Sequence, residues 1–338
     1  MKIAYITPHE GEAELVTGLL AEHDVIFVDE PLFDTVPENI RDAEVLSLFV
    51  NSKLTKEMLD TMPNLKVIAL RSTGFDHVVV AEAQERGVIV TYVPHYGSQT
   101  VAEYTFGLIL SLSRHVNSMY ELLRREGSVD VDVFEGFDLS GKVLGVIGTG
   151  AIGKRVCEIA RGFRMEVIAY DIYPDTSFAE TMSIRYGSLD EVLIASDILT
   201  FHVPATKNNY HILNADTIAK MKAGAYVINT ARGNLIDTVA LILSLKSGHL
   251  AGASLDVFEG EEYLKDEMKL LNTDYKDDDE NVWRSFVAEH ELLDMKNVIM
   301  TPHMAFNTRE AKLEITETTV ENIKKAIAGK SQFEVKLA

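Results

Sequence analysis

Short apolar runs alternate with helix-period segments twice along this chain, and this alternation restricts the fold more than any other feature of the sequence. The first series predicts strands over residues 2–7, 25–28, 45–50, 65–71 and 88–93. Helices are expected between them, over residues 10–22, 55–62 and 78–86. Strands that alternate with helices pair in parallel and are covered by those helices. The first series therefore predicts a helix-covered parallel sheet of domain size.

A second series predicts six further strands, over residues 143–147, 166–170, 198–202, 226–229, 252–256 and 298–301. One long helix is expected over residues 99–126, followed by an acidic, aperiodic arm over 127–140. Residues 259–294 form an acidic stretch longer than the usual connection, which is either functional or a solvated surface. A helix over 308–328 has no later strand to cover, so it is expected to pack back on the first domain. We predict two doubly wound α/β domains, the first of them discontinuous.

Length and charge support this organisation and restrict the partners. The 338 residues exceed the roughly 250 to 300 at which single hydrophobic cores stop growing. Because 52 acidic residues against 32 basic ones give a net charge of −20, nucleic acid and membrane surfaces are not expected as partners. The lone cysteine, Cys157, excludes an internal disulfide and fits a cytoplasmic protein. The first residues have a strand pattern and predict no signal peptide.

A glycine pattern at the start of the second series indicates a dinucleotide site. Gly148, Gly150 and Gly153 form G-x-G-x-x-G directly after an apolar strand and before a helical segment over 154–161. The first glycine permits a tight turn, the second lets the backbone approach a pyrophosphate, and the third allows close helix packing. The alternative is a glycine turn that only links a strand to a helix.

An acidic residue at the expected distance favours the dinucleotide interpretation. Asp171 ends the next strand, near the ~20-residue spacing typical of the carboxylate that binds a ribose diol. Its charge would repel a 2′-phosphate, and the next residues, Ile172 and Tyr173, include no arginine to hold one. The sequence therefore predicts NAD as the cofactor in preference to NADP.

Three polar residues follow strands of the second series and could act on a 2-keto acid. Arg232 lies in VINTARG, Glu261 follows SLDVFEG, and His303 lies in IMTPHMAF. An arginine can hold a carboxylate bidentately, and a histidine with a pKa near about 6.5 can exchange a proton with the carbonyl oxygen. A carboxylate beside that histidine would orient its ring. Each residue also has a structural alternative, as a capping arginine, a loop acid or a core histidine.

The whole set of motifs resembles a known family. GTGAIG, Asp171, FHVPAT, INTARGNLID, SLDVFEGE and TPHMAF, in this order and spacing, resemble the D-specific 2-hydroxyacid dehydrogenases over essentially the whole chain. The long connection between DVFEGE and TPH, together with Tyr96 in VPHYGSQTVAEYTF, is most similar to D-lactate and D-2-hydroxyisocaproate dehydrogenases. The resemblance implies a Rossmann NAD-binding domain over 99–301. It also implies a flavodoxin-like substrate domain over 1–98 and 302–338, with a cleft between the two.

The resemblance also implies the roles of individual residues. Arg232 would clamp the substrate carboxylate, His303 would be the acid/base, and Glu261 its partner. The backbone at Ser72, Thr73 and Gly74 would receive the substrate, and Tyr96 would border the site. The residues implied in cofactor binding, with Asp256 contacting the carboxamide, are Gly148, Thr149, Gly150, Ala151, Ile152, Gly153, Tyr170, Asp171, Val203, Pro204, Asn209, Thr230, Ala231 and Asp256.

Departures from the usual lactate dehydrogenase pattern leave the substrate open. Ser72 and Thr73 replace an Asn-Val-like pair, and His95 and Gly97 flank Tyr96. An apolar wall of Phe49, Phe306 and Met304 would favour a side chain larger than methyl, unless these residues only pack.

Other functions are weighed against the dehydrogenase. A non-catalytic NAD-binding corepressor or scaffold has the same fold, but it would not need three catalytic residues. Oxidation of formate is disfavoured by Glu261, since a glutamine would be expected at that position in a formate dehydrogenase. Oxidation of phosphite stays an alternative. Hydroxypyruvate is a possible substrate, and phosphoglycerate would require further cations. The histidines do not occur at metal-ligand spacing, so no metal site is expected.

The segment over residues 102–123 is rich in apolar residues that could pack against a second copy of the chain. The sequence therefore predicts a homodimer.

Overall fold

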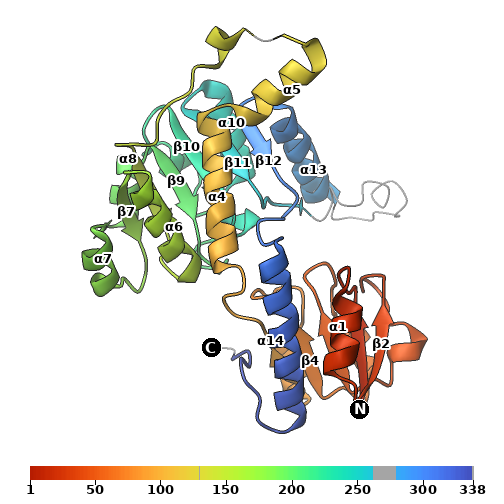
Figure 1. Ribbon diagram of the computed structural model, residues 1–338. Coiled ribbons are helices and arrows are strands. Elements are labelled where there is room, and N and C mark those ends of the chain that lie inside the picture. The colour runs from red at the N-terminus through yellow and green to blue at the C-terminus, as the bar shows by residue number, and fades with distance from the viewer. Residues whose placement is uncertain (129, 262–278, 337–338) are drawn as a thin grey trace. The chain divides into compact units, whose positions relative to one another are not determined.

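The computed structural model describes residues 1–128, 130–261 and 279–336. The chain divides into two compact units (Figure 1), one formed by Met1–Tyr96 with Asn307–Ala338 and the other by Gly97–Phe306. Each unit contains a parallel sheet with helices on both faces. The prediction of two doubly wound parallel-sheet domains is therefore confirmed.

The first unit contains a five-stranded sheet in the order β2-β1-β3-β4-β5. Its strands are β1 (Lys2–Ile6), β2 (Asp24–Val28), β3 (Val45–Leu48), β4 (Val67–Leu70) and β5 (Ile89–Thr91). Its helices are α1 (Glu12–Leu19), η1 (Glu38–Ile40), α2 (Lys56–Asp60), α3 (Val80–Glu85) and α14 (Arg309–Ile327). All of its strand pairs are parallel, which agrees with the near-continuous apolar runs in the sequence.

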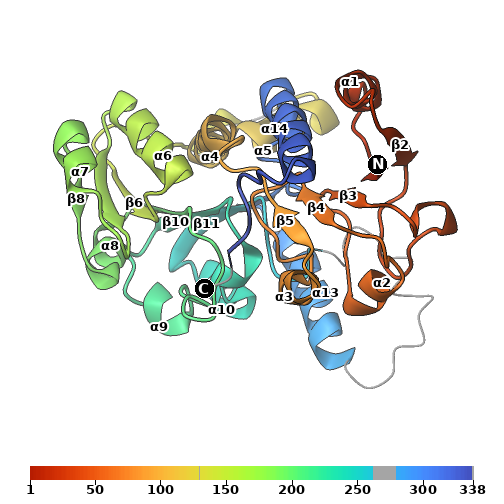
Figure 2. The same cartoon turned by 90° about the horizontal axis from the view of Figure 1, so that it is seen from below.

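Alternate side chains of these strands enter two separate cores. Ile3 and Tyr5 pack with Val320 and Ile323 of α14, whereas Ala4 and Ile6 pack on the opposite face with residues near α2 and α3. Figure 2 shows the sheet between α1 and α14 on one side and α2 and α3 on the other. Because α14 follows the second unit in sequence but packs on β4, the first unit is discontinuous.

The second unit contains a seven-stranded parallel sheet in the order β12-β11-β10-β9-β6-β7-β8. Its strands are β6 (Val143–Ile147), β7 (Glu166–Tyr170), β8 (Arg185–Tyr186), β9 (Ile198–Phe201), β10 (Ala225–Asn229), β11 (Leu250–Leu255) and β12 (Val298–Met300). The strand order reverses at β6, as in a dinucleotide-binding fold. The six predicted strands are present, and β8 was missed because two residues are too short to show a period.

Helices cover both faces of this sheet (Figure 2). They are α4 (Ser98–Ser113), α5 (Val116–Glu126), η2 (Val131–Phe134), α6 (Ala151–Gly162), α7 (Thr176–Met182), α8 (Leu189–Ala195), α9 (Ala215–Ile218), η3 (Gly233–Leu235), α10 (Thr238–Ser247) and α13 (Asp279–Asp294). The end of the acidic stretch that showed no clear periodicity is thus helical. Residues 262–278 of that stretch lie outside the described residues.

The single long helix expected over 99–126 is wrong. The chain forms α4 and α5 with a break at His115, whose φ is 52°. The break has a tertiary cause, because the carbonyl of Ser113 accepts a hydrogen bond from the Phe137 N–H at 3.0 Å. Gly136 lies so close to this carbonyl that a Cβ on it would be 2.4 Å from the oxygen. The segment around Gly136 and Phe137 thus binds the last carbonyl of α4, where a continuing helix would donate an N–H of its next turn.

Candidate active site

The glycine turn between β6 and α6 is shaped by packing at two of its three glycines. Gly148 has φ 94°, and a Cβ there would lie 2.6 Å from the His202 carbonyl oxygen. A Cβ on Gly153 would lie 1.9 Å from the Gly148 oxygen. A Cβ on Gly150, in contrast, would meet no atom of the described residues within 4 Å. Protein packing therefore requires Gly148 and Gly153, whereas Gly150 borders open space.

The start of α6 beside this open space suits an anion. Gly150 is the N-cap residue, and no side chain among the described residues caps the first turn. Ala151 is exposed and Ile152 is half-buried in that turn. Uncapped N–H groups and the positive end of the helix dipole both attract negative charge. The turn therefore fits the pyrophosphate of a dinucleotide.

Asp171 directs its carboxylate at the same turn from the end of β7. Its Oδ2 accepts hydrogen bonds from the N–H and the hydroxyl of Thr149, at 2.6 and 2.9 Å. Its Oδ1 accepts one from the Tyr173 N–H at 2.8 Å. The Thr149 hydroxyl also contacts the Tyr186 hydroxyl at 2.8 Å. Tyr186 was not predicted for this site because its strand, β8, was not predicted.

The other residues implied in cofactor binding lie in loops after β7, β9 and β10. Tyr170 is half-buried at the end of β7. Asn209 closes the loop after Val203 by accepting from the Thr206 N–H at 2.7 Å and donating to the Pro204 carbonyl at 2.8 Å. Thr230 follows β10 and contacts the Thr105 hydroxyl of α4 at 3.1 Å, and the Ala231 N–H donates to Asn229 at 3.0 Å. These loops follow strands of one parallel sheet and therefore share its carboxyl edge.

His303 and Glu261 form a hydrogen-bonded pair after β12 and β11. Nδ1 of His303 lies 2.7 Å from Oε1 of Glu261, and the two side chains are 27% and 24% exposed. Oε2 of Glu261 is buried without a hydrogen-bond partner in the described part of the chain. A cavity of about 320 Å³ adjoins the pair and is lined mainly by apolar side chains such as Phe258 and Met300. The pair is therefore shielded on one side and accessible on the other.

Asp256 fixes the loop that carries His303. Its side chain is fully buried, and Oδ1 accepts from the Thr301 hydroxyl at 2.6 Å and the Met304 N–H at 3.0 Å. Oδ2 accepts from the Ala305 N–H at 2.9 Å, and the Asp256 carbonyl accepts from the His303 N–H at 2.9 Å. This wrapping holds His303 at φ 52°, which is unfavourable for a residue with a Cβ. The sequence did not predict this structural use of Asp256.

Arg232 follows β10 and is half-buried. Its carbonyl accepts from the Asn229 side chain at 2.8 Å, and its own Nη1 donates to the Ala231 carbonyl at 2.8 Å. Because β10 pairs with β11 and β11 with β12, the segments bearing Arg232, Glu261 and His303 leave adjacent strands at one edge of the sheet. The second unit thus offers a cation, an imidazole and its carboxylate partner along one edge.

In the first unit, the predicted substrate loop follows β4. Ser72 is buried, and its hydroxyl donates to the Gly74 carbonyl at 2.6 Å. Thr73 is exposed, and its hydroxyl donates to the Val93 carbonyl at 2.8 Å. Val93 returns a hydrogen bond from its N–H to the Ser72 carbonyl at 3.0 Å. The loop is therefore fastened to the segment that leads to Tyr96, which is half-buried.

The residues of the expected apolar wall do not all belong to one unit. Phe49 is only 6% exposed in the first unit, where its ring packs edge-on against His9 at 5.2 Å. Phe306 and Met304 belong to the second unit, where Phe306 is half-buried and Met304 is exposed. For Phe49, internal packing accounts for its position.

Comparisons with known proteins agree with this geometry. The family model described as "D-isomer specific 2-hydroxyacid dehydrogenase, NAD binding domain" matches residues 106–305. A 2-hydroxyacid dehydrogenase homolog of Zymomonas mobilis is 36% identical over 315 residues, 91% of each chain. D-Lactate dehydrogenase of Escherichia coli is 35% identical over 299 residues, 88% of this chain and 87% of that one. The chain belongs to the D-isomer specific 2-hydroxyacid dehydrogenases.

Solved structures of the family share the whole fold. D-Lactate dehydrogenase of Aquifex aeolicus, complexed with NAD and lactic acid, has a TM-score of 0.85 and 35% identity over 97% of this chain and 96% of its own. D-2-Hydroxyisocaproate dehydrogenase has a TM-score of 0.82 and 28% identity over 99% of both chains. This dehydrogenase is thus an NAD-dependent oxidoreductase, and the predicted family, enzyme class and cofactor are confirmed.

The described residues of the dehydrogenase contain neither a membrane-spanning helix nor a candidate metal cluster. Among the described residues, each helix is too short or too polar to cross a bilayer. The same residues contain no group of three or more histidine, cysteine or acidic side chains arranged to hold a metal ion.

Sequence reasoning missed a buried cation next to the substrate loop. Arg71 directly follows β4, is fully buried, and donates from Nη1 to Oε2 of Glu12 at 2.8 Å. Its Nη2 donates to the carbonyls of Ile6 and Thr7, and its guanidinium lies 4.4 Å from the centre of the Tyr5 ring. Charged residues are almost never fully buried without a partner. An arginine at the end of the apolar run VIALR was therefore a signal that a buried acid exists.

Proposed function

We propose that this dehydrogenase reduces a small 2-keto acid to the D-2-hydroxy acid, the type of reaction for which its lactate dehydrogenase relatives are named. We propose Arg232, Glu261 and His303 as its catalytic residues. The observation that carries the proposal is the His303–Glu261 hydrogen bond of 2.7 Å. It joins the segments that follow β12 and β11, and β11 pairs with β10, the strand that precedes Arg232. A fixed imidazole and a nearby cation are what the reaction needs from the protein.

Each of the three residues has its own task in the proposed reaction. Arg232 binds the substrate carboxylate, and its planar guanidinium can form two parallel hydrogen bonds. Glu261 accepts a hydrogen bond from Nδ1 of His303 and fixes the orientation of the ring, so Nε2 is the nitrogen that exchanges a proton with the substrate oxygen. NADH, when bound, supplies the hydride for the carbonyl carbon. His303 then gives one proton to the oxygen, so that one keto acid, one hydride and one proton yield one hydroxy acid.

The remaining predicted residues bind the two reactants. The turn from Gly148 to Gly153 receives the pyrophosphate, and Asp171 receives the ribose hydroxyls in place of part of its contact with Thr149. We accordingly propose the second unit as the dinucleotide-binding domain and the first as the substrate domain. The loop with exposed Thr73 and half-buried Gly74, together with half-buried Tyr96, is the substrate-binding surface of the first unit.

We further propose a cytoplasmic homodimer. Helix α5 has no buried residue, and it exposes Val116, Tyr120 and Leu123 by 53%, 63% and 53% at one-turn spacing. Helix α4, the other part of the predicted dimer segment, is already buried within the second unit. An apolar stripe of this kind is typical of a helix that packs against a partner. Analytical ultracentrifugation should give a dimer that Tyr120→Glu weakens, and a wild-type monomer would contradict the proposal.

The catalytic proposal is tested with a panel of 2-keto acids. Purified protein should oxidise NADH with pyruvate, hydroxypyruvate, glyoxylate or 2-ketoisocaproate, and the ranking of kcat/KM identifies the preferred side chain. His303→Ala should abolish turnover while NADH binding, followed by fluorescence, stays nearly unchanged. NADH binding without turnover on any acid would favour a non-catalytic corepressor or scaffold. Full activity of His303→Ala would reject the assigned role.

A further inference from the structure

A second histidine–glutamate pair lies near the proposed catalytic pair. Nε2 of His211 is 2.7 Å from Oε1 of Glu259, and both side chains are 24% exposed. Oε2 of Glu259 accepts from the Thr238 hydroxyl at 2.9 Å and from its N–H at 3.4 Å. One carboxylate thus joins three segments, namely the loop before α9, the start of α10 and the turn after β11.

The backbone that carries Arg232 rests directly on the backbone of Glu259. A Cβ on Gly233 would lie 2.2 Å from the Phe258 carbonyl carbon and 2.6 Å from the Glu259 nitrogen. The same turn continues to Glu261, whose N–H donates to the Phe258 carbonyl at 3.4 Å. Any movement of the 258–259 backbone would therefore displace both the Arg232 loop and Glu261.

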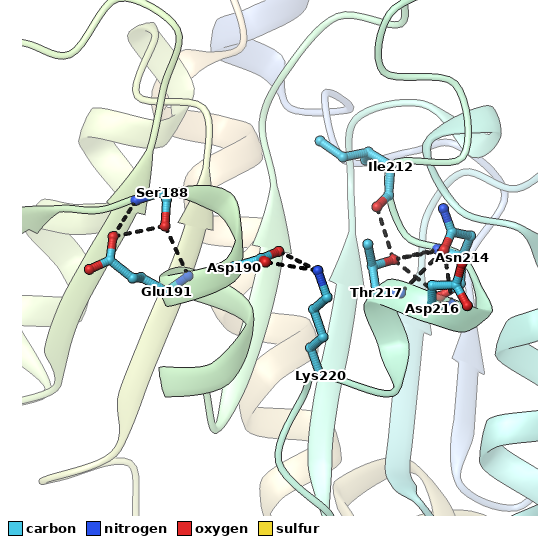
Figure 3. A network of polar contacts seen from close by, with 8 residues as sticks. All are labelled: Ser188, Asp190, Glu191, Ile212, Asn214, Asp216, Thr217 and Lys220. Atoms are coloured by element: carbon cyan, nitrogen blue, oxygen red, sulfur yellow. Dashed lines mark hydrogen bonds and ion pairs between the residues drawn. The ribbon is translucent and has the colours of Figure 1, made fainter.

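His211 is itself fixed by its surroundings. Its N–H donates to the Asn234 carbonyl at 2.9 Å, and its carbonyl accepts from the Asn214 side chain at 2.9 Å. Asn214 is held in turn by the capping box that it forms with Thr217 at the start of α9 (Figure 3). The Tyr210 ring stacks on the His211 ring at 3.9 Å. His211 is therefore a rigid support for the carboxylate of Glu259.

The electrostatics around Tyr210 agree with this placement of Glu259. Partial burial raises the pKa of Tyr210, and the negative charges of Glu259 and Asp237 raise it further. Both carboxylates thus act on the ring that covers His211. Asp237 is separately occupied, because its Oδ1 accepts from the Ala240 N–H at 3.0 Å and caps α10.

We propose that Glu259, held by His211, is a positioning residue that sets the spacing between the carboxylate clamp at Arg232 and the acid/base pair of Glu261 and His303. This inference rests on the proposed function of those three residues. Glu259 acts through the backbone segments and does not touch the substrate. Because misplacing a reacting group by 1 Å can cost about 100-fold in rate, a shift of either segment should be visible in turnover.

The test compares a disruptive with a conservative change at each partner. His211→Leu removes the donor to Glu259, whereas His211→Gln retains an N–H at a similar reach. Glu259→Ala removes the contacts of the carboxylate with His211 and Thr238, whereas Glu259→Gln keeps acceptor and donor atoms. Asp190→Asn is the matched control, since Asp190 pairs with Lys220 at 2.7 Å in the same unit (Figure 3).

Turnover and cofactor binding give the first readout. His211→Leu and Glu259→Ala should lower kcat/KM for the keto acid by about 10- to 100-fold, mostly through KM if the Arg232 loop moves and through kcat if Glu261 moves. The Kd for NADH should stay within about 2-fold. The conservative variants and the Asp190→Asn control should lie within about 3-fold of wild type. Equal losses in His211→Gln and His211→Leu would overturn the role of this hydrogen bond.

A spectroscopic readout separates this inference from the proposed function. The Nδ1 proton of His303, hydrogen-bonded to Glu261, should give a downfield NMR resonance that His303→Gln removes. Glu259→Ala should shift or broaden this resonance, and Asp190→Asn should leave it in place. If the wild-type protein reduced no keto acid but the resonance still responded, the positioning role would stand and the proposed function would fail. An unchanged resonance and unchanged kcat/KM in Glu259→Ala would overturn the inference.

Discussion

Replacing Arg71 by methionine should destabilise the first unit strongly. The guanidinium of Arg71 is fully buried, and its hydrogen bonds reach the Glu12 carboxylate and the carbonyls of Ile6 and Thr7. Methionine fills a similar volume but leaves Glu12, whose side chain is 3% exposed, without its counter-charge. Glu12 also accepts from the Tyr5 hydroxyl at 2.6 Å and the Thr316 hydroxyl at 2.8 Å, so the change affects β1, α1 and α14 together.

The expected loss follows from the burial of both partners. Removing one member of a buried ion pair typically costs about 3–5 kcal/mol, because the other charge stays in a poorly solvated site. That is a large share of the roughly 5–15 kcal/mol by which domains are stable. The exposed pair of Lys66 and Glu44, at 2.7 Å in the same unit, is the control. Lys66→Met should cost no more than about 1 kcal/mol.

The pH dependence of this difference provides a second check. Burial acts to raise the pKa of Glu12, but the charge of Arg71 and hydrogen bonds from Tyr5, the His9 N–H and Thr316 outweigh it, so the pKa lies below its usual value of 4.5. A depressed carboxyl pKa stabilises the folded state above the unfolded pKa, and this stabilisation is lost as the pH falls through the folded pKa. In Arg71→Met the pKa of Glu12 should rise. The difference in unfolding free energy between wild type and Arg71→Met should then become smaller as the pH falls from 7 to 4.

Denaturant unfolding, combined with hydrogen exchange of peptides from β1 and β4, measures the effect within the first unit. The double variant Arg71→Met/Glu12→Gln should be more stable than the sum of the single changes predicts, because the uncompensated charge is gone. A loss below about 1 kcal/mol in Arg71→Met, or a gap independent of pH, would refute the reasoning.

Two further predictions concern the second unit. Asp171→Asn should raise the KM for NADH and lower the preference for NADH over NADPH, because the charge that repels a 2′-phosphate is removed. Thr149→Val serves as the control, since it loses the hydroxyl contact to Asp171 but keeps the charge of Asp171. An unchanged preference for NADH over NADPH in Asp171→Asn would contradict the proposed role of Asp171 in ribose binding. Burial raises the pKa of the Cys157 thiol to about 12, so a thiol reagent should label the native protein at least about 100-fold more slowly than the unfolded protein. Rapid labelling of the native protein at neutral pH would contradict the buried position of Cys157.

Local sequence signals were sufficient for most of the fold. Buried parallel strands such as β6 and β10 are continuous apolar runs between turn residues, so their positions could be predicted. The break between α4 and α5 could not, because its cause is the hydrogen bond from Phe137 to Ser113, which no local pattern records. Strand β8 was missed for a related reason, since its two residues are specified by pairing with β7.

In the candidate site too, local spacing could be predicted from the sequence, whereas contacts between distant segments could not. The contact between the glycine turn and Asp171 could be predicted because their spacing is fixed by one strand–helix–strand unit. The Glu259–His211 contact joins residues 48 positions apart, and Arg71 meets Glu12 across 59 positions. Such pairs depend on which loops the fold brings together. A buried arginine in an apolar run or a second acid in DVFEGE shows only that a partner must exist.

The carboxylates at the strand ends of the second unit share a structural task. Asp171 accepts from two N–H groups and a hydroxyl in the turns after β6 and β7, and Asp256 accepts from two N–H groups and a hydroxyl in the loop after β12. Glu259 fixes His211 and α10, and Glu261 fixes His303. Loops beyond a sheet edge have N–H groups without ladder partners, and a carboxylate with two oxygens can satisfy several of them. Part of the acidity of this chain is therefore used to hold the loops at the sheet edge that bears the candidate active site.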